Sequence, residues 1–115
     1  MERYIGVMVY EILPDGCLNG VGSDTHPNTN NKIFNEIARK KNGFNEQTII
    51  GDYTCSYMNL QGQLIIADLK INQHKKSKGR FEFSWIENEN ETYKGIGWKT
   101  KENQVTVYYE YLFPN

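Results

Sequence analysis

The sequence lacks a long apolar run, a strong excess of charge and a surplus of cysteine. No stretch approaches the roughly 20 apolar residues that a helix needs to cross a bilayer. Thirteen Lys and Arg residues against 14 Asp and Glu residues leave a formal net charge of −1. No global field therefore favours nucleic acid or an anionic membrane, and we expect neither as a partner.

Cysteine is scarce, because Cys17 and Cys55 allow one disulfide at most. Residues 1–10 lack the basic segment and long apolar run of a secretory signal. If this is the natural start, we expect a cytoplasmic protein with both thiols reduced. A mature secreted fragment with an added methionine would have the same sequence, so that alternative stays open.

Residues with catalytic or metal-binding chemistry are also few. His26 and His74 fall in predicted loops, and no spacing links either of them to a cysteine or a carboxylate. Glu87, Glu89 and Glu91 alternate with asparagines but lack the glycine and ligand spacing of a calcium loop. The sequence therefore predicts no catalytic residue, no metal and no cofactor, and a protein that is not an enzyme is favoured.

What the sequence does contain is aromatic residues, with 8 Tyr, 5 Phe and 2 Trp in 115 residues. This length is typical of one domain with its own core, so we expect a single domain over residues 1–115. In the stretch 79–112, Phe81, Phe83 and Trp85 recur at every second residue, which places them on one face of a strand. Two polar turns divide the stretch into three antiparallel strands.

The same alternation and turn chemistry predict further strands along the chain. The predicted strands are 4–13, 17–23, 47–57, 63–72, 80–87, 92–99 and 104–112. Strands at this spacing are typical of an all-β sandwich or barrel. The predicted core residues are Ile65, Ala67, Leu69, Ile71, Phe81, Phe83, Trp85, Val105, Val107 and Tyr109.

The pattern of residues 32–41 is compatible with either a helix or a strand. Ile33, Phe34, Ile37 and Ala38 share one helical face, and Asn42-Gly43 would end such a helix. As a strand the segment alternates poorly. Counted as a strand, however, it brings the total to eight, the number that closes an up-and-down barrel around side chains or one small ligand. We predict a single antiparallel meander barrel or strongly curved sheet of about eight strands, with a short helix at 32–41 as the alternative.

Two features bear on ligand binding. Gly95 and Gly97 leave one strand face bare, either to seat Phe83 or Trp85 or to open a cavity. Several tyrosines lie on predicted inner faces, where they either fill the core or line a cavity for a flat or amphipathic ligand. The candidate ligand-binding residues are Tyr53, Tyr57, Phe83, Trp85, Tyr93, Gly95, Gly97 and Tyr109.

Residues 51–111 carry a family resemblance. The segments involved are Gly51–Tyr53, Leu64–Ile66, Phe81–Trp85, Tyr93–Gly97 and Val105–Tyr109. Their pattern resembles that of small uncharacterised bacterial proteins of the calycin type, the lipocalin- and avidin-like β-barrels. The resemblance implies the barrel fold. It transfers no ligand-binding residue, because the lipocalin glycine and tryptophan near the first strand are absent.

The sequence thus favours a non-catalytic protein that holds a small, partly apolar or aromatic ligand inside a β-barrel. The alternative is a protein-interaction module, an inhibitor or neutralising partner, that uses loops 23–31, 74–80 and 87–91. The last two loops flank one strand and carry opposite charges. This alternative therefore predicts a barrel with oppositely charged ends that binds a protein partner.

Overall fold

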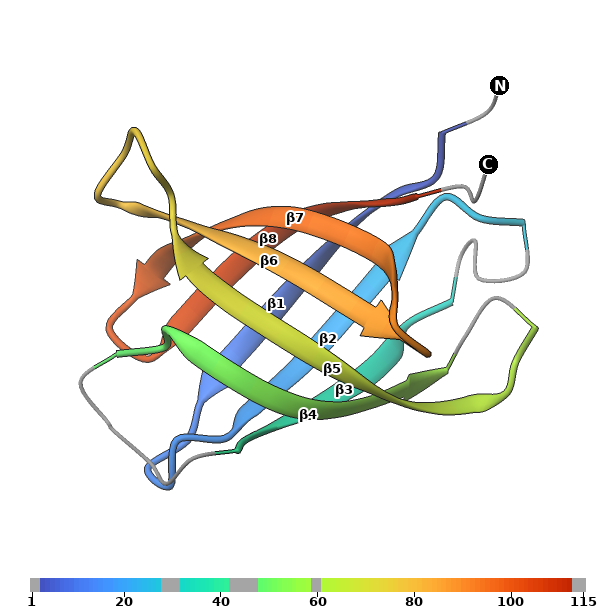
Figure 1. Ribbon diagram of the computed structural model, residues 1–115, viewed down its shortest axis with the longest axis horizontal. Helices are drawn as coiled ribbons and strands as arrows, with labels where there is room; N and C mark the ends of the chain where they lie inside the picture. Colours follow the sequence, from blue (N-terminus) through green and yellow to red (C-terminus); the bar gives the residue numbers. More distant parts are fainter. Residues whose placement is uncertain (1–2, 28–31, 42–47, 59–60, 113–115) are drawn as a thin grey trace.

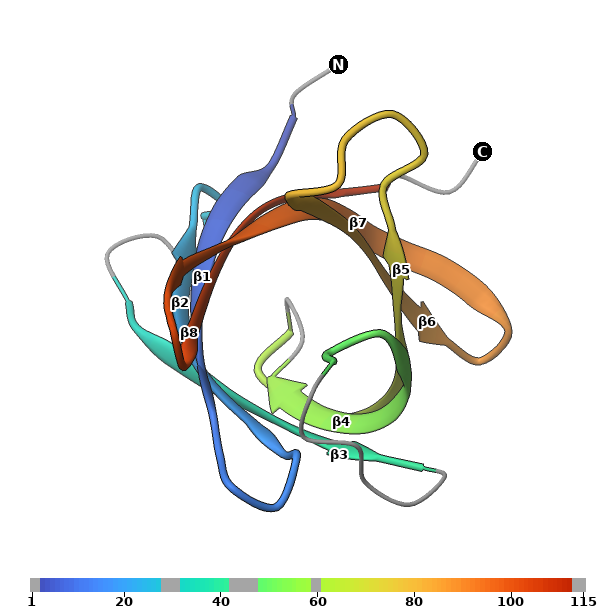
Figure 2. The same cartoon turned by 90° about the vertical axis from the view of Figure 1, so that its left-hand side faces the viewer.

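The computed structural model describes residues 3–27, 32–41, 48–58 and 61–112, which form eight strands and no helix. Each strand pairs antiparallel with the next, and β1 also pairs with β8, so the sheet closes into a barrel. Figure 1 shows the barrel from the side and Figure 2 along its axis. The strands are β1 (Ile5–Ile12), β2 (Leu18–Asp24), β3 (Phe34–Lys40), β4 (Gly51–Met58), β5 (Leu64–Gln73), β6 (Arg80–Glu87), β7 (Asn90–Lys101) and β8 (Gln104–Tyr111). The predicted all-β fold class is confirmed.

The helix alternative at residues 32–41 is wrong, because this segment contains strand β3. The strand pairs with β2 on one edge and with β4 on the other, so its backbone groups are satisfied without helical hydrogen bonds. Glu36 and Ala38 point into the barrel, whereas Ile37 points outward and is 48% exposed. The alternation looked poor in the sequence because a carboxylate occupies an inner position and an isoleucine an outer one.

The barrel is filled by alternate residues of its strands. Eight of the ten predicted core residues are buried, and Ile65 and Phe81 are partly buried against them. Tyr10, Leu69, Ile71, Val105 and Val107 are fully enclosed at 0% exposure. The aromatic and aliphatic positions predicted from the alternating pattern therefore form one continuous core.

Two bare strand positions let aromatic rings lie across the sheet. A Cβ atom on Gly20 would lie 2.7 Å from the ring of Tyr10, and one on Gly97 would lie 2.7 Å from the ring of Phe83. The rings of Tyr10 and Phe83 stack on each other in the middle of the barrel, with centroids 6.0 Å apart and planes within 7°. The glycines of β2 and β7 therefore make room for this stacked pair.

Replacing Gly97 by alanine is expected to lower the free energy of unfolding by about 1–3 kcal/mol, because the new methyl group would overlap the Phe83 ring. Gly79→Ala is the matched control, since a Cβ atom there has no atom within 4 Å. Urea denaturation of both variants measures the difference. Equal stability of the two would show that Phe83 does not pack on β7 at this point.

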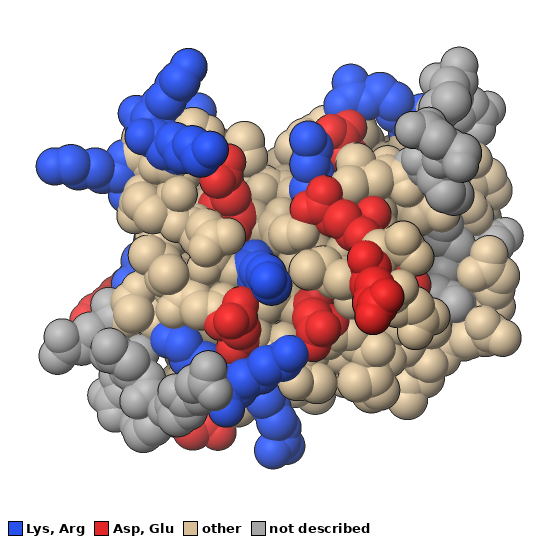
Figure 3. Space-filling model, in the orientation of Figure 1, with Lys and Arg blue, Asp and Glu red and all other residues tan. Residues whose placement is uncertain are grey.

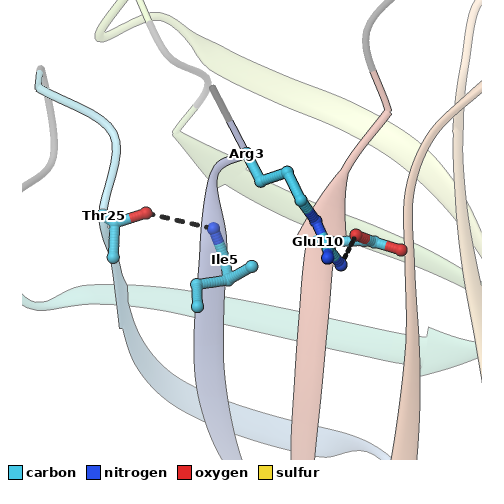
Figure 4. Close-up of polar contacts among 4 residues, drawn as sticks. All are labelled: Arg3, Ile5, Thr25 and Glu110. Atoms are coloured by element: carbon cyan, nitrogen blue, oxygen red, sulfur yellow. Dashed lines mark hydrogen bonds and ion pairs between the residues drawn. The ribbon is translucent and has the colours of Figure 1, made fainter. Parts of the chain in front are cut away.

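One end of the barrel contains the pocket described below and is defined here by the elements that meet at it. The start of β1, the end of β8 and the connections β2–β3, β4–β5 and β6–β7 share one end, which we call the terminal end (Figure 1). There Arg3 forms an ion pair with Glu110, and the backbone N–H of Ile5 donates to Thr25 (Figure 4). These contacts tie the first strand to both of its neighbours. The described residues contain no helix that is long and apolar enough to span a membrane.

Candidate functional site

A pocket opens into the barrel at the terminal end. The space within it that the centre of a water molecule can reach measures about 20 Å³, and the wider void of about 360 Å³ includes open solvent at its mouth. A space of about 20 Å³ holds about one water molecule. The pocket is lined by Met8, Asp24, Phe34, Glu36, Tyr57, Met58, Trp85, Tyr93 and Tyr109.

Glu36 is the buried charged residue of this pocket, at 3% exposure. It lies on β3 opposite Gly20 of β2, which in turn lies opposite Tyr10 of β1. Because Gly20 has no side chain, the Tyr10 hydroxyl reaches across β2 and donates to Glu36 Oε2. Trp85 Nε1 donates from β6 to both carboxylate oxygens, at 3.1 and 3.0 Å.

The Glu36 carboxyl group has two neutral hydrogen-bond donors and no ion-pair partner among the described residues. Burial raises the pKa of Glu36 to about 7, because the charged form loses its hydration inside the barrel. The hydrogen bonds from Tyr10 and Trp85 oppose that rise. Glu36 thus changes charge near neutral pH, in contact with the pocket.

Four aromatic rings line the pocket together with Glu36, and we call Tyr57, Trp85, Tyr93 and Tyr109 the aromatic cluster. The centroid of Tyr93 lies 6.1 Å from that of Tyr57, 6.3 Å from that of Trp85 and 5.9 Å from that of Tyr109. The interplanar angles of these three contacts are 84°, 80° and 79°. Edge-to-face packing holds the rings firmly and turns their faces in different directions around the pocket.

The hydroxyl groups of the aromatic cluster are neutral donors. Tyr57 donates to Glu87, and Tyr109 donates to Asp24 Oδ2 at 3.2 Å. Burial raises the pKa values of Tyr57, Tyr93 and Tyr109 above the ordinary range of a phenol. The Tyr93 hydroxyl has no hydrogen-bond partner within the described part of the chain, and its side chain is 9% exposed. Tyr93 therefore keeps a polar group available to an occupant of the pocket.

The structure brings together four of the eight candidate residues from the sequence, namely Tyr57, Trp85, Tyr93 and Tyr109. The other four do not line this pocket. Tyr53 donates to the Ile49 carbonyl at 2.8 Å, away from the terminal end. Phe83 stacks between Tyr10 and Trp85, and Gly95 and Gly97 are covered by neighbouring side chains of the core.

Sequence reasoning missed Glu36, Asp24, Met8, Phe34 and Met58. Glu36 carried the one available signal, since a charged residue at an inner position interrupts the alternation of β3. A polar residue inside a core is costly, so it tends to mark a functional position. Asp24 and Met58 lie at strand ends beside loops, where sequence pattern says little about direction.

Other chemistry-bearing groups do not form a site in the described chain. Cys17 and Cys55 are free thiols, and no three His, Cys, Asp or Glu residues among those described are placed to hold a metal ion. A broader depression of about 550 Å³ crosses the outer faces of β5 to β8, with Lys70, Lys94, Glu82 and Glu91 in its lining. Lysine and glutamate side chains both line it, so it carries charges of both signs (Figure 3).

The loops of the alternative function lie at both ends of the barrel. Residues 87–91 are at the terminal end and 74–80 at the other. In Figure 3 basic side chains gather where the β5–β6 loop lies in Figure 1. Of the loop 23–31, residues 28–31 lie outside the described residues. The acidic and basic loops are therefore separated by the length of the barrel.

No protein-family model, no curated protein and no solved structure matches this chain. The closed antiparallel barrel of eight strands agrees with the calycin-type resemblance at the level of architecture. The feature of this chain that bears on function is therefore the pocket itself.

Proposed function

We propose that this protein binds a small, partly apolar ligand, without catalysis, in the pocket at the terminal end of its barrel. The pocket is open to solvent at one end and has room for about one water molecule between its side chains, which limits the occupant to a small molecule. The observation that carries the proposal is the aromatic cluster around a buried carboxyl group, because apolar walls with few convergent polar groups are typical of ligand sites.

The dimensions of the pocket limit the size of the occupant. The pocket holds about one water molecule, so only a small polar group enters it without displacement of the rings. A flat or compact apolar part would lie nearer the solvent, where Met58 is 45% exposed. The ligand class is therefore a small amphipathic molecule whose polar end points inward.

Native mass spectrometry of the protein isolated from its own host is expected to show a retained small molecule that is released on unfolding. Tyr93→Leu should weaken retention about tenfold, because the variant removes a ring at the centre of the aromatic cluster. Tyr108→Leu is the matched control, since Tyr108 lies on the outer face of β8 and is 44% exposed.

Equal retention by the two tyrosine variants would place the ligand outside this pocket. A protein without any retained molecule, whose pocket also fails to take up the small aromatic probes described below, would contradict ligand binding altogether.

A further inference from the structure

We infer that the ligand of this pocket is a small protonated amine, whose ammonium group lies against Glu36 and the faces of the aromatic cluster. This inference rests on the proposed function and specifies the class of ligand. It is drawn from three independent features of the pocket: the sign of its charge, the aromatic rings in its lining and the unused hydrogen-bonding capacity of its polar groups.

The charge of the pocket has one sign. Among the residues that the structure describes, its lining contains the carboxyl groups of Asp24 and Glu36 and no Lys, Arg or His. A third carboxyl group, that of Glu87, accepts a hydrogen bond from the hydroxyl of Tyr57, which lines the pocket. A ligand anion would be repelled by these carboxylates in a partly desolvated space, whereas a cation would be attracted.

The rings provide a second attraction for a cation. The faces of tyrosine and tryptophan carry a negative quadrupole that binds organic ammonium ions, and several rings around one space act together. Within the aromatic cluster, Tyr93 stands at 80° to Trp85 and at 79° to Tyr109. In each of these contacts the edge of one ring covers part of the face of the other, and a compact cation would approach the ring surface that is left uncovered along the pocket.

The polar groups of the pocket have unused capacity. A carboxylate has about four acceptor positions, and Glu36 receives hydrogen bonds only from Tyr10 and Trp85 among the described residues. Its Oε1 accepts only the shared indole N–H. An ammonium N–H would use this oxygen, and the free acceptor position of the Tyr93 hydroxyl would take another.

Binding of the amine also releases the proton of the Glu36 carboxyl group. Burial favours the neutral form of Glu36, and an ammonium ion beside it favours the carboxylate, so the proton of Glu36 leaves to solvent as the cation enters. The titratable groups that face Glu36 are Tyr10, Cys55, Tyr93 and Tyr109, and burial raises the pKa of each. These four stay neutral, which leaves Glu36 as the acid that responds.

The test compares three probes of nearly equal shape, namely benzylamine as the cation, benzyl alcohol as the neutral molecule and benzoate as the anion. Each is titrated at about pH 8, above the pKa of Glu36. The NMR signal of the Trp85 indole N–H reports the pocket, and that of Trp98, which is 38% exposed on the outer face, is the internal control. We expect benzylamine to bind at least about tenfold more tightly than benzyl alcohol, and benzoate not to bind.

Glu36→Gln is expected to weaken benzylamine about tenfold or more and to leave benzyl alcohol within about twofold. Glu102→Gln, which removes the same charge from an exposed turn, should change neither affinity. Equal binding of benzylamine and benzyl alcohol to the unaltered protein would overturn the amine inference and leave the proposed function standing. If no probe shifts the Trp85 signal, and no ligand is retained from the host, the proposed function fails as well. The comparison of probes on the unaltered protein does not depend on the folding of any variant.

Discussion

Trp85→Ala is expected to lower the free energy of unfolding by about 3–5 kcal/mol, the largest effect of any single substitution considered for this protein. Trp85 is 3% exposed and packs against the rings of Phe83, Tyr93 and Tyr109. Its removal leaves a cavity and takes from Glu36 the indole hydrogen-bond donor. A total stability of roughly 5–15 kcal/mol is typical of such a domain, so the variant should be partly unfolded at moderate temperature.

The midpoint of thermal unfolding measures this loss, and a decrease of about 10–20 °C is expected for a domain of this size. Trp98→Ala is the control because Trp98 lies outside the barrel, 38% exposed, with Arg80 over its ring. It should lose no more than about 1 kcal/mol. A Trp85→Ala variant that melts at the temperature of the unaltered protein would contradict the assignment of the core.

Glu36→Gln is expected to stabilise the protein by about 3 kcal/mol above neutral pH and by much less under acidic conditions. The pKa of Glu36 is about 7 in the folded protein, against an ordinary value of 4.5. Each unit of difference corresponds to about 1.4 kcal/mol. The glutamine keeps an oxygen acceptor for Tyr10 and Trp85 but never becomes charged, so it avoids the cost of a buried carboxylate.

The sign follows from proton linkage. The folded protein binds the Glu36 proton more tightly than the unfolded chain does, so this contribution to stability is fully present below pH 4.5 and is lost as the pH rises through about 7. Urea denaturation from about pH 5 to pH 9 should therefore show the unaltered protein losing stability relative to Glu36→Gln. The exposed Glu102→Gln variant should follow the unaltered protein throughout. Parallel curves for the unaltered protein and Glu36→Gln would show that Glu36 titrates as an exposed carboxyl group.

Most of the barrel could be predicted because its strands obey the alternation of inner apolar and outer polar residues. Phe83 and Trp85 on β6 and Val105 and Val107 on β8 are all buried as that rule requires. The register of β1 could not be assigned, since both of its faces carry apolar residues. In the structure Met8 and Tyr10 are inside, and Val7 is outside and 49% exposed. Pairing with β2 and β8, which no local pattern encodes, decides this.

The candidate site was only half predictable, and the missing half is its polar part. The tyrosines of the aromatic cluster follow from alternation, because Tyr57, Tyr93 and Tyr109 occupy inner positions of their strands. Glu36 does not, because the apolar residues around it share one helical face, so residues 32–41 also fitted a helix. Its position depends on the bare backbone of Gly20 and on a donor 49 residues away, Trp85. Such a contact between distant strands requires the closed barrel to be known first.

The carbon-13 NMR signal of the Glu36 side-chain carboxyl group, followed through a pH titration with and without saturating benzylamine, tests the buried carboxyl site most directly. We expect an apparent pKa of about 7 in the free protein and a lower value when the amine is bound, because the ammonium ion stabilises the carboxylate. A carboxyl group that titrates near 4.5 and is indifferent to benzylamine would contradict both the burial of Glu36 and its part in ligand binding.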